Sequence, residues 1–472
     1  MRLFDTIAAI STPHGKGGVA LLRVSGTDAL AVASRVFRPK NGKPLDAAAP
    51  RMAIYGTIYA PDAGEWVAVD DGIATVFATP ASFTGEDTVE ICCHGGILVT
   101  QTVLSALLAA GARMAEAGEF TRRAHLNGKL GLGAAEALGS LLEAGNRAQM
   151  TLAYGGLGGK LEKKSRACYE RLRHVMTSVL ACIDFPDEDL AEMSSEEMER
   201  ELRRTLVELQ ALSATYRTGH AVAEGIPTVI CGRTNAGKSS LYNQLLGRDA
   251  AIVTDIEGTT RDVLCETTSL GKVTLRLYDT AGLRETQDAV ERIGIERARA
   301  AMESAELVLA LFDLTRPLRE EDEQLLSELV EREMSGKAQV VALLNKADAQ
   351  PSGEVAVKTE QTVRACLDRV LRISAKSGQG MDELGALVEE MFLDGALNLR
   401  DDAVIANARQ HAAVIRATEA LERTLEALAA ALPMDLCCED LSGAMSALSE
   451  LDGREINEDV VNEIFKHFCV GK

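Results

Sequence analysis

The sequence has few aromatic residues and no long apolar segment. Aromatic residues make up 4% of the 472 positions, with one tryptophan, whereas apolar residues of all kinds make up 46%. Alanine, leucine and valine must therefore fill most of the interior. No run reaches the length of about 20 apolar residues that a membrane helix needs, and the N-terminal stretch MRLFDTIAAISTP has too short an apolar run for a signal peptide. We therefore expect a cytoplasmic protein that does not span a membrane.

The cysteine spacing that is typical of zinc or redox sites is also missing. The chain has ten cysteines but no CxxC pair, and without an export signal these thiols are expected to stay reduced. Two adjacent pairs occur, Cys92 with Cys93 and Cys437 with Cys438. Because neighbouring residues on a strand point to opposite faces, we expect Cys92 and Cys93 to serve core packing rather than metal binding.

A basic excess is absent as well. The 70 acidic and 50 basic residues leave a net charge of −20, which argues against general coating of nucleic acid. A local basic patch that holds one particular RNA remains compatible with this charge. The length predicts roughly two to four domains.

The hydrophobic period changes several times along the chain. Residues 1–122 mix short strand-like runs with glycine turns and predict an α+β domain. Residues 123–220 and 385–472 have a helical period, and the intervening residues 221–384 alternate strands with helices. The fold class is therefore multidomain α/β plus α, in which an α/β domain is inserted into a discontinuous helical domain. Within the first helical segment, SSEE predicts a helix start near Ser194.

The stretch PTVICGRTNAGKSSLYNQLLG contains a phosphate-binding loop. Residues 232–239 fit the pattern G-x-x-x-x-G-K-S, with a strand before it and a helix after it. Backbone N–H groups of such a loop surround a β-phosphate, and its glycines let the chain approach closely. Lys238 is expected to reach the β- and γ-phosphates, and the Ser239 hydroxyl to bind Mg²⁺.

Later motifs identify the nucleotide as GTP. GTTRD supplies Thr260 as a second Mg²⁺ ligand, and DTAGL supplies Asp279, which would hold the metal through water, and Gly282, which would meet the γ-phosphate. The stretch NKAD ends in Asp348, whose carboxylate can accept two hydrogen bonds from guanine that adenine cannot offer. These motifs, in this order, predict a GTPase.

The position that holds a water-orienting glutamine in Ras-like enzymes is Leu283 here. Another group must therefore position the attacking water. Glu291, in AVERIGIERA, is a candidate acid, although on sequence chemistry alone a solvated helical carboxylate is the simpler interpretation.

Together these motifs resemble the MnmE (TrmE) family of tRNA-modification GTPases over essentially the whole chain. The segments that carry the resemblance include GKGGVALLRVSG, SFTGEDTVEICCHGG, GEFTRRAHLNGKLGL, IDFPDED, VERIGIERA and FCVGK. The resemblance implies an N-terminal folate-binding and dimerisation domain, a discontinuous helical domain and an inserted G domain. It also implies a homodimer that joins the FAD-containing protein MnmG in a heterotetramer. That assembly would use a one-carbon tetrahydrofolate, 5-formyl- or methylene-tetrahydrofolate, to add an aminomethyl or carboxymethylaminomethyl group to C5 of the wobble uridine of certain tRNAs.

The resemblance also assigns site residues. The residues expected to contact GTP are Asn235, Ala236, Gly237, Lys238, Ser239, Ser240, Thr254, Asp255, Ile256, Glu257, Gly258, Thr259, Thr260, Asp279, Thr280, Ala281, Gly282, Asn345, Lys346, Ala347, Asp348, Ser374, Ala375 and Lys376. The folate site would involve Arg23, Glu90, Lys129 and Lys472. A bound K⁺ in place of an arginine finger would be held by Asn235, Thr254, Ile256 and Thr259. Glu291 would order the attacking water from a distance.

The C-terminal HFCVGK ends with a cysteine and three further residues. It is not a prenylation box, because Gly471 is not aliphatic and Lys472 is not an accepted last residue. The resemblance implies that Cys469 reaches the folate pocket and acts in catalysis; a purely structural thiol is the alternative.

Two other classes compete with the modification enzyme. An Era-like switch GTPase shares the phosphate loop and NKxD but lacks SFTGEDTVE and the terminal CVGK, and a structural adaptor for MnmG is the third possibility. Folate binding separates the enzyme from an Era-like switch.

Overall fold

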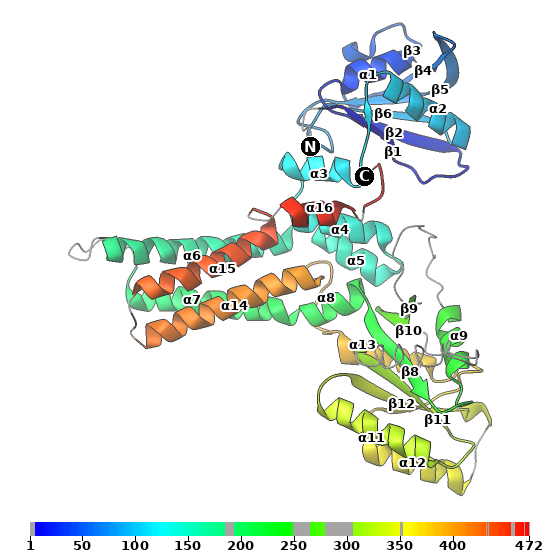
Figure 1. Ribbon diagram of the computed structural model, residues 1–472, viewed down its shortest axis with the longest axis vertical. Coiled ribbons are helices and arrows are strands. Elements are labelled where there is room, and N and C mark those ends of the chain that lie inside the picture. Colours follow the sequence, from blue (N-terminus) through cyan, green and yellow to red (C-terminus); the bar gives the residue numbers. More distant parts are fainter. Residues whose placement is uncertain are drawn as a thin grey trace, which may run out of the picture. The chain divides into compact units, whose positions relative to one another are not determined.

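The computed structural model describes residues 5–184, 193–248, 265–278, 305–349, 353–430, 432, 434–454, 458–466 and 468–471. The chain forms two compact units (Figure 1). The first unit contains residues 1–139 and 449–472, and the second contains residues 140–448. Within the described ranges, no helix is both long and apolar enough to cross a membrane.

The first unit is built on a seven-stranded sheet. The strands are β1 (Ile7–Ile10), β2 (Val19–Ser25), β3 (Phe37–Pro39), β4 (Ala53–Asp62), β5 (Glu65–Phe77), β6 (Thr88–His94) and β7 (Arg113–Met114). Their order in the sheet is β3-β4-β5-β6-β2-β1-β7, and only the β1–β7 pair is parallel. Along β2, Leu22 and Val24 are fully buried while Arg23 between them points to the opposite face.

Helices pack on this sheet and beside it. They are α1 (Ala29–Val36), α2 (Ile97–Ala109), α3 (Glu119–Leu126), α4 (Leu132–Glu143) and α16 (Glu458–Lys466), with a short 3₁₀ turn at Leu45–Ala47. The main core lies between the sheet and the helices α1 and α2, and it includes Leu22, Ile58 and Leu107. The predicted α+β class of this unit is therefore confirmed. Cys93 is buried in the same core and Cys92 on the other face is half-buried.

The second unit contains a helical region made from two separate segments of the chain. Its helices are α5 (Arg147–Gly156), α6 (Lys160–Asp184), α7 (Ser195–Ala214), α8 (Tyr216–Ala223), α14 (Ala408–Ala429) and α15 (Met434–Asp452). Figure 1 shows α6, α7, α14 and α15 side by side. The segments are joined by hydrogen bonds such as Ser213 Oγ to His411 Nε2 at 3.1 Å and Ser165 Oγ to the Leu448 carbonyl at 2.8 Å. The predicted discontinuous helical domain is thus present.

The segment between these helices forms an α/β domain. Its sheet contains β8 (Ile226–Gly232), β9 (Cys265–Leu270), β10 (Val273–Tyr278), β11 (Leu307–Asp313), β12 (Gln339–Asn345) and β13 (Val370–Arg372), in the order β13-β12-β11-β8-β10-β9. All neighbouring strands are parallel except β9 and β10. Its helices are α9 (Lys238–Arg248), α11 (Glu320–Met334), α12 (Glu354–Cys366) and α13 (Met381–Phe392), with a 3₁₀ turn at Ala347–Ala349.

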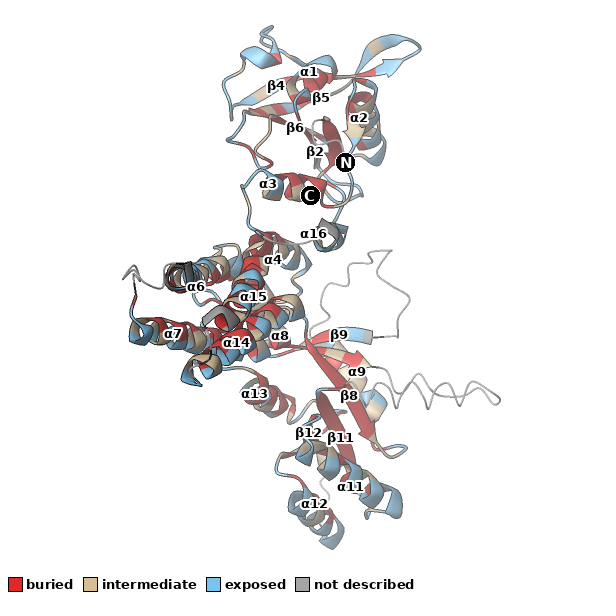
Figure 2. Ribbon diagram, turned by 60° about the vertical axis from the view of Figure 1, so that its left-hand side comes forward, coloured by how far each residue is buried: buried red, intermediate tan, exposed pale blue. Residues whose placement is uncertain are grey.

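Both faces of this sheet are covered, as the alternating pattern predicts. One apolar cluster joins the sheet to α9 and α13, and another joins it to α11 and α12. The parallel strands are therefore buried on both faces, which explains why β8, β11 and β12 read as nearly continuous apolar runs (Figure 2). The exact domain boundaries predicted from sequence, at residues 122, 220 and 384, stay predictions.

Candidate functional site

The carboxyl ends of the parallel strands of the α/β domain bring several polar residues together. Strand β8 ends at Gly232, β11 ends at Asp313 and β12 ends at Asn345. In the sheet, the next strands along the chain, β9 and β10, lie on one side of β8, whereas β11 lies on the other side of β8. Ligands of open α/β sheets bind outside the carboxyl ends of strands at such a switch point.

The loop from β8 to α9 has the backbone shape of a phosphate loop. Gly232 and Gly237 have φ angles of 139° and 108°, which other residues rarely adopt. A Cβ atom at Gly237 would collide with the side-chain nitrogen of Asn345, so only glycine allows this approach. Helix α9 begins at Lys238, which places the N-terminal N–H groups of a helix beside the loop.

Lys238 is held inside this loop. Its Nζ donates hydrogen bonds to the carbonyls of Gly232 at 2.7 Å and Arg233 at 3.0 Å. Its ammonium group therefore already lies within the curve of the loop where a phosphate would bind. Arg233 pairs with the carboxylate of Asp322 at 3.3 Å, which ties the loop to α11.

Asn345 connects the phosphate loop to the loop that follows β13. Its side-chain nitrogen donates to the Ala236 carbonyl at 2.7 Å, and its side-chain oxygen accepts from the Ala375 amide at 2.9 Å. The side chain is only 2% exposed. Asn345 therefore links the phosphate loop to the loop that follows β13, and its predicted contact with GTP stays a prediction.

Asp348 presents an exposed carboxylate that is oriented by Ser374, whose hydroxyl donates to Asp348 Oδ1 at 2.8 Å. Lys346, with an unusual φ of 69°, pairs with Asp313 at 2.6 Å. Burial disfavours the Asp313 carboxylate, but hydrogen bonds from Lys346 and Thr315 outweigh it and hold the pKa of Asp313 below its usual value. Of the other residues predicted to cover the base, Lys376 is exposed and Ala375 is buried, and the reading of guanine by Asp348 stays a prediction.

The described residues suit both predicted metals. Ser239 is exposed in the first turn of α9, directly after Lys238, so its hydroxyl can reach Mg²⁺ beside a bound phosphate. Asn235 is exposed with a φ of 65°, and its amide oxygen suits K⁺. The other predicted residues of this site lie outside the described residues: Thr254, Asp255, Ile256, Glu257, Gly258, Thr259, Thr260, Asp279, Thr280, Ala281, Gly282 and Glu291.

In the first unit, the sheet register places Arg23 directly opposite Glu90. Arg23 donates from Nε at 2.9 Å and from Nη2 at 2.8 Å to Glu90 Oε1. Its guanidinium also lies over the rings of Phe83 and Phe120, at 5.0 and 5.5 Å from their centroids. The side chains of Arg23 and Glu90 are 15% and 22% exposed, so both members of this ion pair are half-buried.

Lys129 forms a hydrogen bond to the loop that follows β5. Its Nζ donates to the Pro80 carbonyl at 2.9 Å, and Asn127 donates to the Thr84 carbonyl at 2.7 Å. The segment NGK is therefore bound to the loop of residues 80–84, which contains Phe83. Arg23, Glu90 and this loop form one half-buried polar site with an exposed aromatic edge.

The C-terminal tail returns to the same unit. Val470 pairs with Ala117, the Gly118 amide donates to the Cys469 carbonyl at 3.4 Å, and the Ser11 hydroxyl donates to the Gly471 carbonyl at 3.0 Å. Gly471 has a φ of 100°, and a Cβ there would collide with the Ile10 carbonyl. The tail is therefore anchored beside β1, with the Cys469 thiol exposed, whereas Lys472 lies outside the described residues.

A buried charge network was not assigned from sequence. Arg123, 3% exposed, contacts the carboxylates of Asp5, Glu86 and Glu119, and Arg113 pairs with Asp5 and Glu119. The hydrogen bond from Arg113 is the main cause of the lowered pKa of Asp5. Burial disfavours the Glu119 carboxylate, yet hydrogen bonds from Arg113, the Glu116 amide and Arg123 lower its pKa. The sequence feature that could have indicated one of these ion pairs is the spacing of Glu119 and Arg123, which are four residues apart on a helix.

The comparisons with known proteins cover the whole chain. The family model described as the GTP-binding protein TrmE N-terminus matches residues 6–129, and the MnmE helical domain matches residues 132–469. The tRNA modification GTPase MnmE of Symbiobacterium thermophilum is 41% identical over 468 residues, which cover 99% of each chain. The protein of the same name from Acetivibrio thermocellus is 36% identical over 469 residues, again with 99% of each chain covered.

A crystal structure of an Era variant from Aquifex aeolicus, bound to GDP and AlF4⁻, matches 41% of this chain and 65% of that chain at 25% identity. Its TM-score of 0.28 is too low to support an argument. The full-length relatives and the family models instead carry the assignment: the chain belongs to the MnmE (TrmE) family of tRNA modification GTPases.

Proposed function

We propose that this protein hydrolyses GTP and, with the FAD-dependent partner MnmG, modifies C5 of the wobble uridine of certain tRNAs using a one-carbon tetrahydrofolate. The observation that carries the proposal is the joint presence of two sites on one chain. One is the phosphate loop with Asn345 and Asp348, and the other is the polar site of Arg23 and Glu90.

The nucleotide site supports hydrolysis of GTP through positioning. Lys238 and the N–H groups of the loop would hold the phosphates, Asp348 would hold guanine, and Ser239 would bind Mg²⁺. Mg²⁺ and K⁺ would supply positive charge where negative charge develops during phosphoryl transfer. Leu283 cannot orient water, so this task falls to Glu291 in the proposal.

The polar site of the first unit supports binding of folate. Glu90 can accept from adjacent N–H groups of a pterin, while Arg23 and Lys129 can donate to carbonyl or carboxylate oxygens. The exposed edge of Phe83 offers an apolar surface for a flat ring. The folate would supply the carbon that is transferred, and the anchored tail would bring Cys469 and Lys472 to the same unit.

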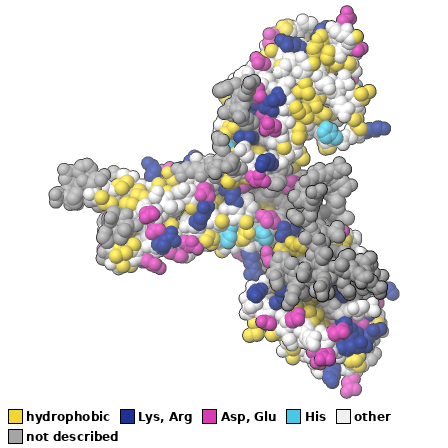
Figure 3. Space-filling model, in the orientation of Figure 1, with side chains coloured by type: hydrophobic (Ala, Val, Ile, Leu, Met, Phe, Trp, Pro, Cys, Tyr) yellow, Lys and Arg dark blue, Asp and Glu magenta, His cyan; other side chains and the backbone are white. Residues whose placement is uncertain are grey.

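A homodimer formed through the first unit is part of the proposal. Tyr55 and Ile73 face each other on β4 and β5, and both are exposed, at 57% and 44%. Val19, Ile97 and Leu98 are further exposed apolar side chains of this unit. Figure 3 shows hydrophobic side chains gathered on the visible face of this unit. Exposed apolar patches of this kind mark interaction surfaces.

The decisive experiment is mass spectrometry of wobble nucleosides from a strain in which the gene is deleted. We expect the C5-modified uridines to disappear and to return when the wild-type gene is restored. Retention of the modification in the deletion strain would contradict the proposal.

A binding measurement separates the proposed enzyme from an Era-like switch. The wild-type chain should bind 5-formyltetrahydrofolate in a calorimetric titration, and Glu90→Gln should weaken that binding while GTP binding is unchanged. An Era-like protein would not bind folate at all.

A further inference from the structure

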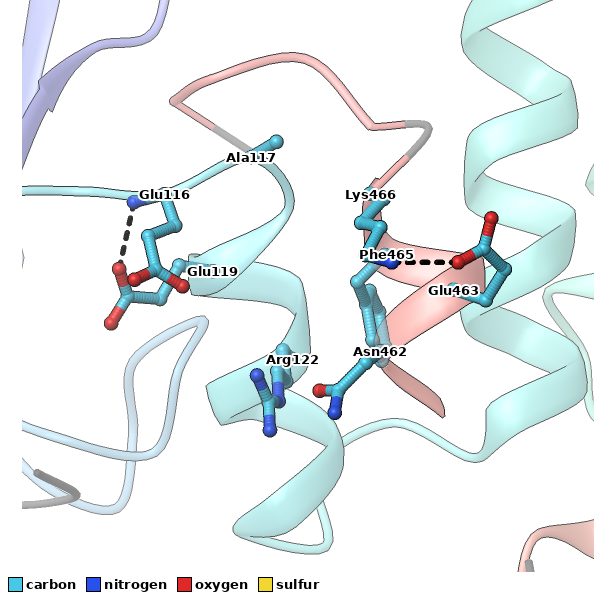
Figure 4. Close-up of a pocket in the computed structure, with 8 residues that line it drawn as sticks. All are labelled: Glu116, Ala117, Glu119, Arg122, Asn462, Glu463, Phe465 and Lys466. Carbon is cyan, nitrogen blue, oxygen red and sulfur yellow. Dashed lines mark hydrogen bonds and ion pairs between the residues drawn. The ribbon is translucent and has the colours of Figure 1, made fainter. Parts of the chain in front are cut away.

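A pocket in the first unit lies between α3 and α16 and has a volume of about 650 Å³ (Figure 4). This volume falls within the range of about 300–1,000 Å³ that is typical of small-molecule sites. None of the residues lining this pocket is Arg23, Glu90 or Lys129, the three residues of the proposed folate site that the structure describes.

Several charged side chains of this pocket already have partners. Glu119 accepts from Arg113 at 2.7 Å and from the Glu116 amide at 2.8 Å. Lys466 pairs with Glu463 at 2.8 Å. The buried ring of Phe465 forms an apolar part of the lining and contacts the ring of Phe468. The lining is therefore held in place by contacts within the unit.

Two other residues of the lining each contain a buried polar atom that has no hydrogen-bond partner among the described residues. Arg122 Nε and Asn462 Oδ1 are both buried, and neither makes a hydrogen bond. Figure 4 shows the two side chains extending next to each other into the space between the helices. A buried polar group without a partner is costly, and each such group requires an explanation.

The two groups are chemically complementary to a particular kind of ligand. Arg122 Nε is a hydrogen-bond donor and Asn462 Oδ1 is an acceptor. A ligand that satisfies both presents an acceptor beside a donor, as a ring carbonyl and the N3–H of uracil do. Proteins that act on a base in RNA bind it unstacked and read these edge groups.

We propose that this pocket holds the target uracil of the tRNA substrate, with Arg122 donating to a ring carbonyl and Asn462 accepting from N3–H. This assignment rests on the proposed function. The pocket is also next to the tail, because its lining residue Ala117 pairs with Val470, one residue after Cys469. A base in the pocket would therefore lie next to the part of the tail that contains Cys469.

The test is photo-cross-linking of the full chain, in the presence of MnmG, to a tRNA that carries 5-bromouridine at the wobble position. The bromine leaves the carbonyl and N3–H edge of the base intact. We expect the cross-linked peptides, identified by mass spectrometry, to come from α3 or α16. Asn462→Leu and Arg122→Gln should each lower the yield at least about tenfold, since each removes one hydrogen bond to the base.

Arg38→Gln is the matched control, because Arg38 is an exposed arginine of the same unit that stacks on Tyr59 outside the pocket. This variant should cross-link as the wild type does. Asn462→Leu should also keep the unfolding midpoint of the wild type, since the replaced oxygen has no internal hydrogen bond to lose. A structural role for Asn462 would instead lower that midpoint.

Cross-links outside α3 and α16, no cross-link to these helices, or unchanged yields in both variants would overturn the inference. The proposed function is tested independently of the pocket, because it would be contradicted if the modified uridines persist in the deletion strain. If the modification requires this chain and the cross-links map elsewhere, only the assignment of the pocket is wrong.

Discussion

Asp348 illustrates how a single side chain can select the nucleotide. Its exposed carboxylate is oriented by the buried Ser374 hydroxyl at 2.8 Å. Guanine offers two N–H donors to such a carboxylate, whereas xanthine offers an acceptor at one of these positions. The charge at residue 348 is therefore expected to decide which base is bound.

We expect Asp348→Asn to weaken GTP binding by roughly 10- to 100-fold, because hydrogen bonds to a charged group are worth about 1.5–3 kcal/mol. The same variant should bind xanthosine triphosphate better than the wild type does. Titration with fluorescent nucleotides measures both affinities. Wild-type affinity for GTP in the variant would show that another residue reads the base.

Removal of the Arg123 side chain would deprive the buried carboxylate of Glu119 of one of its charged partners. Arg123 is 3% exposed, and its neighbour Glu119 is 1% exposed. We expect Arg123→Gln to lower the free energy of unfolding of the first unit by about 3 kcal/mol, as for other broken buried ion pairs. Fluorescence of Trp66, the single tryptophan, reports this unit during denaturation because the side chain packs against its core.

Arg122→Gln is the control for this substitution. Arg122 is the adjacent residue on α3, and its Nε has no hydrogen-bond partner among the described residues. Its replacement should leave the Trp66 transition unchanged. Equal destabilisation by the two substitutions would contradict a specific role for the Arg123 network.

The same network predicts how stability depends on pH. The pKa values of Asp5 and Glu119 are lowered in the folded protein. Their stabilising contribution is therefore complete above the usual carboxyl range of about 4 and is lost as the pH falls through the lowered values. Acid-induced unfolding of the first unit, measured by the fluorescence of Trp66, should accordingly occur at higher pH in Arg123→Gln than in the wild type.

At the scale of elements, α7 begins where its sequence predicts. Ser194 accepts from the Glu197 amide at 3.3 Å, and the Glu197 carboxylate accepts from the Ser194 amide at 2.9 Å. This capping box confirms the helix start predicted near Ser194 and satisfies two amides that the helix itself cannot. Helix α7 then packs against α14, from the other segment of the helical region.

Ser194→Ala should lower the stability of this helical region by about 1 kcal/mol, because it removes the acceptor of the cap. Far-ultraviolet circular dichroism during denaturation measures the effect. Ser195→Ala is the matched control, since Ser195 is the next residue and the first within the helix. Equal losses in the two variants would mean that the cap contributes nothing specific.

At the scale of the whole molecule, GTP hydrolysis is expected to depend on the monovalent ion. Asn235 is exposed in the phosphate loop with a φ of 65°, where its amide oxygen can face an ion beside the phosphates. K⁺ but not Na⁺ should therefore speed hydrolysis, since neutral oxygens spaced for K⁺ lie too far apart for the smaller ion. Phosphate release in the two chloride salts measures this dependence.

Asn235→Ala should remove the effect of K⁺, while Asn243→Ala, on the exposed face of α9, should keep it. Equal rates of the wild type in the two salts would exclude this role for K⁺. The assignment of the GTPase would not change, because it rests on other residues.

The tail provides a second prediction at this scale. It brings Cys469 to the first unit, whereas the phosphate loop lies in the second. Cys469→Ser should therefore abolish tRNA modification and leave GTP hydrolysis near the wild-type rate, as measured by nucleoside mass spectrometry and phosphate release. Full modification by the serine variant would make Cys469 a structural thiol.

The features that could be predicted from the sequence are those that depend on neighbouring residues. The phosphate loop, the Asp348 motif and the Ser194 cap are short segments whose backbone geometry follows from local residue types, such as glycine at positive φ. The alternation of strand-like and helix-like patterns in residues 221–384 also predicted an α/β domain inserted into a helical domain.

Contacts between distant residues could be identified only after the chain was seen in its folded form. The pairing of Arg23 with Glu90, the bridge from Asn345 to Ala236 and the return of the tail to Ala117 join positions far apart in the chain. Hydrophobic alternation tells which face of a strand is buried, but it does not tell which strand lies beside it or in which register. The burial of Arg123 and the unpaired groups of Arg122 and Asn462 depend on how α3 packs between its neighbours, so no local pattern could have identified them.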